Sequence, residues 1–174
     1  MSGSNKQGCS PFCVDGARRR LLGSLLAGAG VVVVGGKLQA AEEGDGEELR
    51  FPGDPPEHHI VYQFNKADLG YQDHVIFSIG AVLRKYGDNV KIVVVAFAEG
   101  IHILAKKPGR EVKEEIRQRV SSLAHYGVEF HACGNTMKSL QWTQEDLVPF
   151  AKVVEVGAAD IMELQEQGYA YISW

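Results

Sequence analysis

The hydrophobic pattern of residues 58–172 alternates between short apolar runs and longer segments with helical periodicity. The short runs have the β-branched and aromatic content of strands, and they cover residues 58–64, 90–97, 128–133, 153–156 and 169–172. The longer segments repeat apolar side chains at spacings of three and four residues, which predicts helices over 68–86, 110–126, 135–140 and 158–167. A loop or short helical turn is expected at 100–104, and a capped turn at 143–146.

The run at 90–97 is apolar at almost every position, which is typical of a strand buried on both faces of a parallel sheet. Alternating strands and helices favour connections that cross the sheet and return in the same direction. We therefore predict a three-layer α/β/α domain with a mostly parallel five-stranded sheet. In such sheets, ligands bind at the carboxyl ends of the strands.

The first forty residues follow a different pattern. Three arginines at 18–20 precede an apolar run at 21–34, and small residues follow it. This order is typical of a secretory signal, and the paired arginines favour the twin-arginine export route. We expect residues 1–40 to be a cleaved signal and the mature protein to be periplasmic. An uncleaved membrane anchor is the alternative, although the apolar run is shorter than the roughly 20 residues that span a bilayer.

Composition separates a linker from the folded domain. Residues 41–56 are rich in Glu, Gly, Asp and Pro, which predicts a flexible acidic linker before a domain at 57–174. The formal net charge is −4, and removal of the basic signal makes the remainder more acidic. An acidic domain disfavours nucleic acid as a partner. Once the signal is cleaved, no apolar run is left for stable membrane insertion.

Cys133 would be the single cysteine of the mature protein, because Cys9 and Cys13 precede the arginines. A single thiol cannot form an internal disulfide, so it is a packed core residue, an intermolecular link or a reactive group. Cys133 lies where a predicted strand meets a predicted helix. Free backbone N–H groups and the helix dipole stabilise a thiolate at such a junction. An inert buried thiol is the alternative, since free cysteines are among the most buried residues.

The residues after Cys133 fit a binding role. Gly134 would let the backbone approach a group carried on the sulfur, and Asn135 and Thr136 can cap the helix or donate hydrogen bonds. His131 lies two positions before Cys133 and therefore shares its strand face, where an imidazole can lower the thiol pKa.

His102 follows the second predicted strand at the same sheet edge, so it is a second candidate for this pocket. A small-ligand or metal site built from His102 and His131 is a further hypothesis, against which both are ordinary edge or surface histidines. The histidines have no metal-ligand spacing, and we find no cofactor motif. We therefore expect neither a bound metal nor a cofactor.

Three segments resemble the DsrE/DsrF-like family: ACGNTMK at 132–138, TQEDL at 143–147 and ELQEQGYAYI at 163–172. The resemblance implies a three-layer α/β/α fold that forms homo- or hetero-oligomers. Better-studied members are cytoplasmic sulfur-relay proteins whose cysteine receives a persulfide from a sulfurtransferase and passes it onward. By resemblance, Cys133 would carry that persulfide, and the partners would be further copies of the chain and a sulfur donor or acceptor protein. The alternative is a non-catalytic oligomeric scaffold with an inert cysteine.

Overall fold

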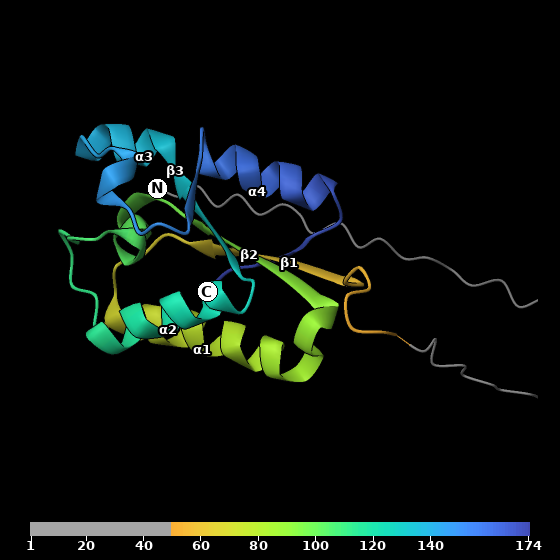
Figure 1. Cartoon of the computed structure of the whole chain (residues 1–174). Coiled ribbons are helices and arrows are strands. Elements are labelled where there is room, and N and C mark those ends of the chain that lie inside the picture. The colour runs from red at the N-terminus through yellow and green to blue at the C-terminus, as the bar shows by residue number, and fades with distance from the viewer. Residues whose placement is uncertain (1–49) are drawn as a thin grey trace, which may run out of the picture. The chain divides into compact units, whose positions relative to one another are not determined.

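A computed structural model describes residues 50–174 of the chain (Figure 1). The predicted export signal and residues 41–49 of the predicted linker lie outside the described residues. The strands within 50–174 are β1 (His58–Phe64), β2 (Val90–Ala96), β3 (Glu129–Cys133), β4 (Ala151–Val154) and β5 (Ala170–Ile172). The α-helices are α1 (Leu69–Tyr86), α2 (Glu114–His125), α3 (Gly134–Leu140) and α4 (Gly157–Glu166). Short 3-10 helices lie at η1 (Gly87–Asn89), η2 (Ala98–Leu104) and η3 (Gln144–Asp146).

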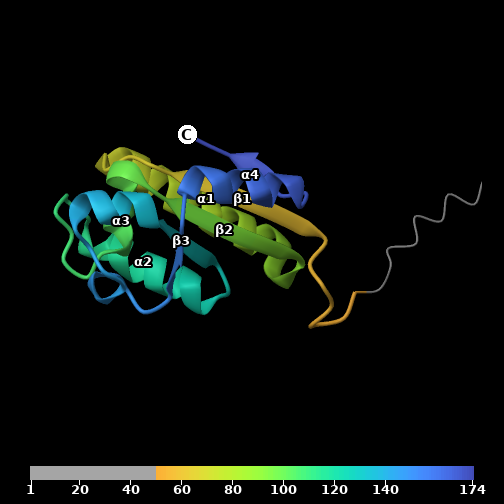
Figure 2. The ribbon, with the colours of Figure 1, turned by 90° about the horizontal axis from the view of Figure 1, so that it is seen from above.

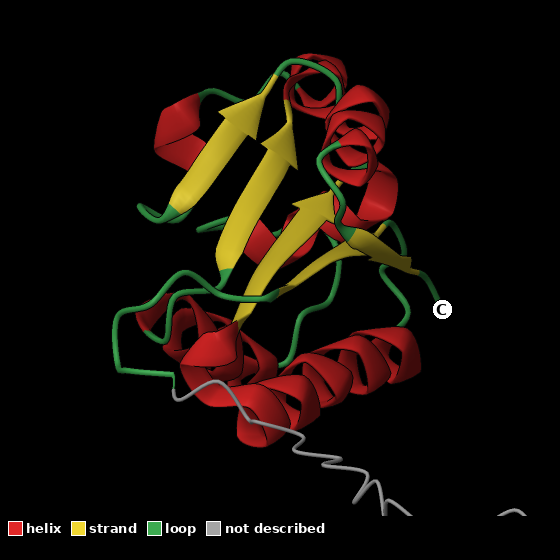
Figure 3. Ribbon diagram, turned by 90° about the vertical axis from the view of Figure 1, so that its right-hand side faces the viewer, coloured by secondary structure: helices red, strands yellow, loops and turns green. Residues whose placement is uncertain are grey.

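The strands form one parallel sheet in the order β4-β3-β2-β1-β5. Helices lie on either side of the strands (Figure 3). α1 and α2 pack together on one face, and α4 lies across β1, β2 and β3 on the other (Figures 1 and 2). The predicted three-layer α/β/α architecture is therefore confirmed, and every strand pair in the sheet is parallel.

β2 explains the nearly continuous apolar run, because its side chains point alternately to the two helical layers. Val94 belongs to the buried cluster under α1 and α2, whereas Val93 and Val95 belong to the cluster under α4. The middle of a strand that is buried on both faces leaves no position at which a polar side chain could reach solvent. Lys91, the one charged residue of β2, lies near its start, and its side chain is 41% exposed.

Two element boundaries differ from the prediction. The fourth strand begins at Ala151, opposite Phe130, instead of at residue 153, and it ends before Val156, which is the N-cap of α4. The second helix begins at Glu114 instead of at residue 110, because the backbone before it is held by a tertiary contact: the carbonyl of Glu111 accepts a hydrogen bond from the buried Gln72 side chain. Hydrophobic periodicity does not detect either effect.

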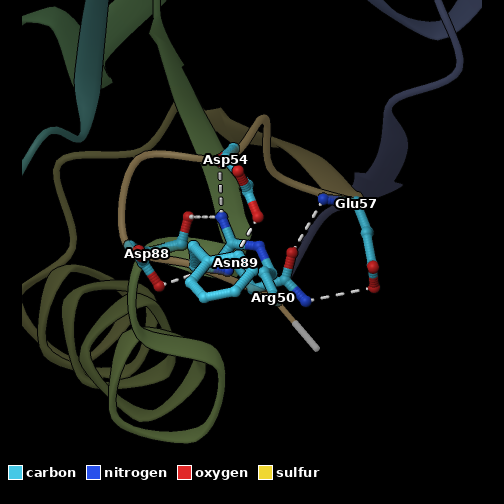
Figure 4. Close-up of polar contacts among 6 residues, drawn as sticks. Arg50, Asp54, Glu57, Asp88 and Asn89 are labelled. Carbon is cyan, nitrogen blue, oxygen red and sulfur yellow. Dashed lines mark hydrogen bonds and ion pairs between the residues drawn. The ribbon is translucent and has the colours of Figure 1, made fainter. Parts of the chain in front are cut away.

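Residues 50–57 contact η1 through two polar groups (Figure 4). The Arg50 guanidinium donates to a carboxylate oxygen of Asp88 at 2.7 Å and to the backbone carbonyl of Asp54 at 2.7 Å. The Glu57 N–H donates to the Asn89 side-chain oxygen at 2.8 Å, and the Asn89 amide donates back to the Glu57 carboxylate at 3.1 Å. These contacts hold the entry to β1 against the end of α1.

Candidate functional site

Cys133 is the last residue of β3 and the N-cap of α3, and it is 6% exposed. β4 lies beside β3, so the chain leaves β4 next to Cys133 and begins α4 there. The Gly157 N–H, at the start of α4, donates to the Cys133 sulfur at 3.2 Å. The sulfur therefore contacts a second helix start, which lies 24 residues away in the sequence.

Gly157 is needed for this close approach. A Cβ at this position would lie 3.1 Å from Cys133 Cβ and 3.4 Å from Phe97 Cβ. Both distances are at or inside ordinary van der Waals contact, so a larger residue would push the first turn of α4 away from the sulfur.

One hydrogen bond and several nearby polar groups act on the sulfur. Burial alone raises the pKa of the Cys133 thiol, because it disfavours the charged form. The Gly157 N–H, which donates to the sulfur, outweighs that effect together with the nearby N–H and hydroxyl groups of Thr136 and the N–H of Asn135, so the net pKa lies below its ordinary value. The site therefore favours the thiolate, which is the nucleophilic form of cysteine.

Thr136 joins the end of β2 to the site. Its hydroxyl oxygen accepts a hydrogen bond from the Ala98 N–H at 3.1 Å, which leaves the hydroxyl proton for the sulfur. Ala98 has a positive φ of 48°, a conformation that is uncommon outside glycine. The backbone after β2 is thus bent toward α3, where it meets the Thr136 side chain.

Gly134 lies against the connection between β4 and α4. A Cβ on Gly134 would lie 3.0 Å from the Val154 carbonyl oxygen, and the next N–H, that of Asn135, donates to the Glu155 carbonyl at 3.2 Å. In this structure, Gly134 allows α3 to approach this connection. Its predicted role beside a group on the sulfur stays a prediction.

His131 lies on the same face of β3 as Cys133, since both residues bond to α4, but its ring points to carboxylates. Nδ1 lies 2.7 Å from the Asp160 carboxylate. Nε2 is buried and lies 3.5 Å from a Glu129 oxygen, too far for a well-formed hydrogen bond. Within residues 50–174 the ring makes no hydrogen bond to the sulfur, so His131 can affect Cys133 only indirectly.

His102 borders a separate cavity of about 600 Å³, together with Asn135, Thr136 and the ion pair Glu99–Arg110. Its Nδ1 accepts a hydrogen bond from the Gly109 N–H at 3.2 Å. Burial lowers the pKa of His102, the Arg110 charge lowers it further and Glu99 opposes them. This histidine is therefore a neutral hydrogen-bond acceptor at physiological pH.

The structure thus divides the predicted site residues into two groups. Asn135 and Thr136 touch both the sulfur environment and the cavity, whereas His102 borders the cavity alone and His131 lies under α4. The two histidines do not converge on one ligand. Among residues 50–174, no group of three or more His, Cys, Asp or Glu side chains is placed to hold a metal ion.

Gly157 and Asp160 are site residues for which the sequence predicted no role. The signal that points to them is a small residue at the start of a helix, GAAD at 157–160, directly after a strand. That signal becomes informative only when the neighbouring strand is known to end in Cys133.

Comparison with known proteins identifies the family. The family model described as "DsrE/DsrF-like family" matches residues 58–174. No curated protein matches the chain. None of the helices among residues 50–174 has the length and apolar character needed to cross a membrane.

Two solved structures are similar to the chain. The protein of unknown function MTH1491 from Methanobacterium thermoautotrophicum is 27% identical, with a TM-score of 0.61, and the match covers 68% of this chain and all of that one. The ychN protein from E. coli is 13% identical, with a TM-score of 0.49, and the match covers 67% of this chain and 99% of that one. The chain belongs to the DsrE/DsrF-like family.

Proposed function

We propose that the protein binds or relays sulfane sulfur as a persulfide on Cys133. The observation that carries this proposal is the set of N–H and O–H donors around the Cys133 sulfur, which lowers the thiol pKa in spite of burial. Membership of a family associated with sulfur relay supports the same chemistry.

The reaction is a transfer of a sulfur atom without net oxidation. The Cys133 thiolate attacks the outer sulfur of a donor persulfide or polysulfide and forms a new S–S bond. The S–S bond within the donor breaks, and its electron pair leaves on the donor thiolate. The hydrogen bonds from Gly157 and Thr136 stabilise Cys133 as the anion that attacks and, when the sulfur moves on, as the anion that is released.

The setting of this chemistry is part of the proposal. The arginine pair and apolar run within residues 1–40 favour twin-arginine export, so we place the protein in the periplasm. We propose that it acts there as a homo-oligomer and exchanges sulfur with a donor or acceptor protein rather than releasing a small product.

A second function has one observation in its favour. Cys133 is only 6% exposed, as a core cysteine would be. In that case, the domain is a non-catalytic oligomeric binding or scaffold module, and the hydrogen bonds to the sulfur serve packing alone.

Intact mass separates the two functions. The chain carries Cys9→Ser and Cys13→Ser, so that Cys133 is its one thiol, and it is treated with a polysulfide donor. The same chain with Cys133→Ser is the control. A sulfur carrier gains the mass of one or more sulfur atoms only when Cys133 is present, and reductant removes them. A chain that gains no sulfur, and whose Cys133 is alkylated only after unfolding, would support the scaffold.

A further inference from the structure

Two side-chain hydrogen bonds link β3 to the first turn of α4. Cys133 accepts a hydrogen bond from the Gly157 N–H at 3.2 Å. Three residues later on α4, the Asp160 carboxylate bonds to the His131 ring at 2.7 Å, and His131 lies two residues before Cys133 on β3. The two contacts therefore join the same two elements at neighbouring points.

We propose that His131 and Asp160 are positioning residues that hold the first turn of α4 against β3 and so keep the Gly157 N–H on the Cys133 sulfur. The inference rests on the proposed function, in which Cys133 reacts as a thiolate. It assigns a role to a largely buried pair that makes no hydrogen bond to the sulfur within residues 50–174.

Among residues 50–174, no other side chain holds the start of α4 by a hydrogen bond of this kind. The N-cap residue, Val156, has an apolar side chain that makes no capping hydrogen bond. Helices usually satisfy their first N–H groups with a polar N-cap side chain. Here the Gly157 N–H is satisfied by the sulfur itself, so its position depends on what else fixes the helix start.

The pair is largely shielded from solvent, and a carboxylate lies on either side of the His131 ring. The side chains of His131 and Asp160 are 3% and 15% exposed. On the other side of the ring, Glu129 lies 3.5 Å from Nε2 and is itself paired with Lys91 at 3.0 Å. A short bond between largely buried partners constrains geometry more than an exposed ion pair does.

A simpler explanation makes the opposite prediction. Asp160 is an acidic residue in the first turn of α4, where its negative charge stabilises the helix by interacting with the helix dipole. If it acted only as a charge near the sulfur, its removal would make the thiolate more stable. If it positions Gly157, its removal weakens the hydrogen bond to the sulfur and makes the thiolate less stable.

The test is a thiol titration without any sulfur donor. The full chain carries Cys9→Ser and Cys13→Ser, so that Cys133 is its one thiol, and the thiolate is followed by ultraviolet absorbance against pH with Cys133→Ser as the baseline. We expect Asp160→Ala to reduce the thiolate fraction at neutral pH by about tenfold. Asp160→Asn keeps an oxygen that accepts from Nδ1–H, so we expect a smaller loss, below about threefold. Glu163→Ala, one turn further along α4, is the matched control and should leave the titration unchanged.

The two Asp160 variants remove the same charge, so their difference isolates positioning. A titration of Asp160→Ala that matches the wild type, or that coincides with Asp160→Asn, overturns the proposal. If Asp160→Ala does not fold, His131 is changed instead. His131→Leu removes the hydrogen bond to Asp160, whereas the amide of His131→Asn can still donate to it, so the two variants give the same comparison. Failure of sulfur loading would remove the proposed function but would not alter these titrations, so the two failures are distinguishable.

Discussion

The two faces of the sheet differ in how they are buried. Under α1 and α2, a cluster of 22 buried residues, from Tyr62 to Ala151, joins the strands to both helices and to η2. Under α4, the corresponding cluster has six, and beside it lie Cys133, the His131–Asp160 pair and the Lys91–Glu129 ion pair. The first face therefore holds most of the buried apolar side chains and supplies most of the stability, whereas the second places two polar pairs beside the thiol.

The largest expected effect tests the face under α1 and α2. Ile79 is fully buried on α1, so we expect Ile79→Ala to lower the free energy of unfolding by about 2–5 kcal/mol. Because the substitution lies on the opposite face from the sulfur, the Cys133 titration should not move. Denaturant unfolding and the thiol titration measure the two quantities.

Phe77, on the same helix, is the control for Ile79. It is 65% exposed, so Phe77→Ala should change the free energy of unfolding by no more than about 0.5 kcal/mol. A shift in the thiol titration of folded Ile79→Ala would show that the two faces are coupled and would contradict the division of roles.

A smaller change in stability is expected when one glycine on each face is replaced by alanine. Gly157→Ala places a methyl group 3.1 Å from Cys133 Cβ, so we expect a loss of about 1–3 kcal/mol and a weaker hydrogen bond to the sulfur. Gly80→Ala on α1 meets only the end of the flexible Arg84 side chain at 3.5 Å, and alanine favours a helix over glycine by roughly 1 kcal/mol.

In thermal unfolding, Gly157→Ala should therefore lower the stability of the protein, and Gly80→Ala should raise it. Only Gly157→Ala should also decrease the thiolate fraction at neutral pH. Equal stability changes in the two variants would mean that the start of α4 yields to the methyl group, and that its contact with Cys133 is not tight.

The same contrast explains how much could be predicted from the sequence. Periodicity depends on each residue's own neighbours, so the five strands, the four α-helices and the parallel sheet were correctly predicted. The fourth strand was placed about two residues late because Val156 looks like a strand residue, although it precedes a helix.

The candidate site could be predicted only in part, because it joins separate segments. The junction at Cys133 is visible in the local sequence. Its bond to Gly157 depends on β4 lying beside β3, and the Asp160 partner of His131 depends on α4 packing on that face. Both contacts join residues that are far apart in the sequence and follow no regular spacing. The sequence alone could therefore name His131 as a candidate but could not find its partner.

The smallest expected effect is a dependence of stability on pH that belongs to the α4 face. The pKa of Cys133 is lower in the folded protein than its ordinary value, because the Gly157 hydrogen bond and the nearby polar groups of Thr136 and Asn135 outweigh burial. A lowered folded pKa means that the unfolded chain binds more protons between the two pKa values, so stability rises with pH across that window.

The wild type should therefore gain stability over Cys133→Ser as the pH rises from the folded pKa to the ordinary thiol pKa, and the gain should level off above it. As the pH falls through the folded pKa, this contribution is lost. Denaturant unfolding of both proteins at a series of pH values measures the difference, and titrations of all other groups cancel in it. A difference that is flat, or that shrinks as the pH rises, would mean that the folded protein does not favour the thiolate, and the α4 face would then be a second packing surface.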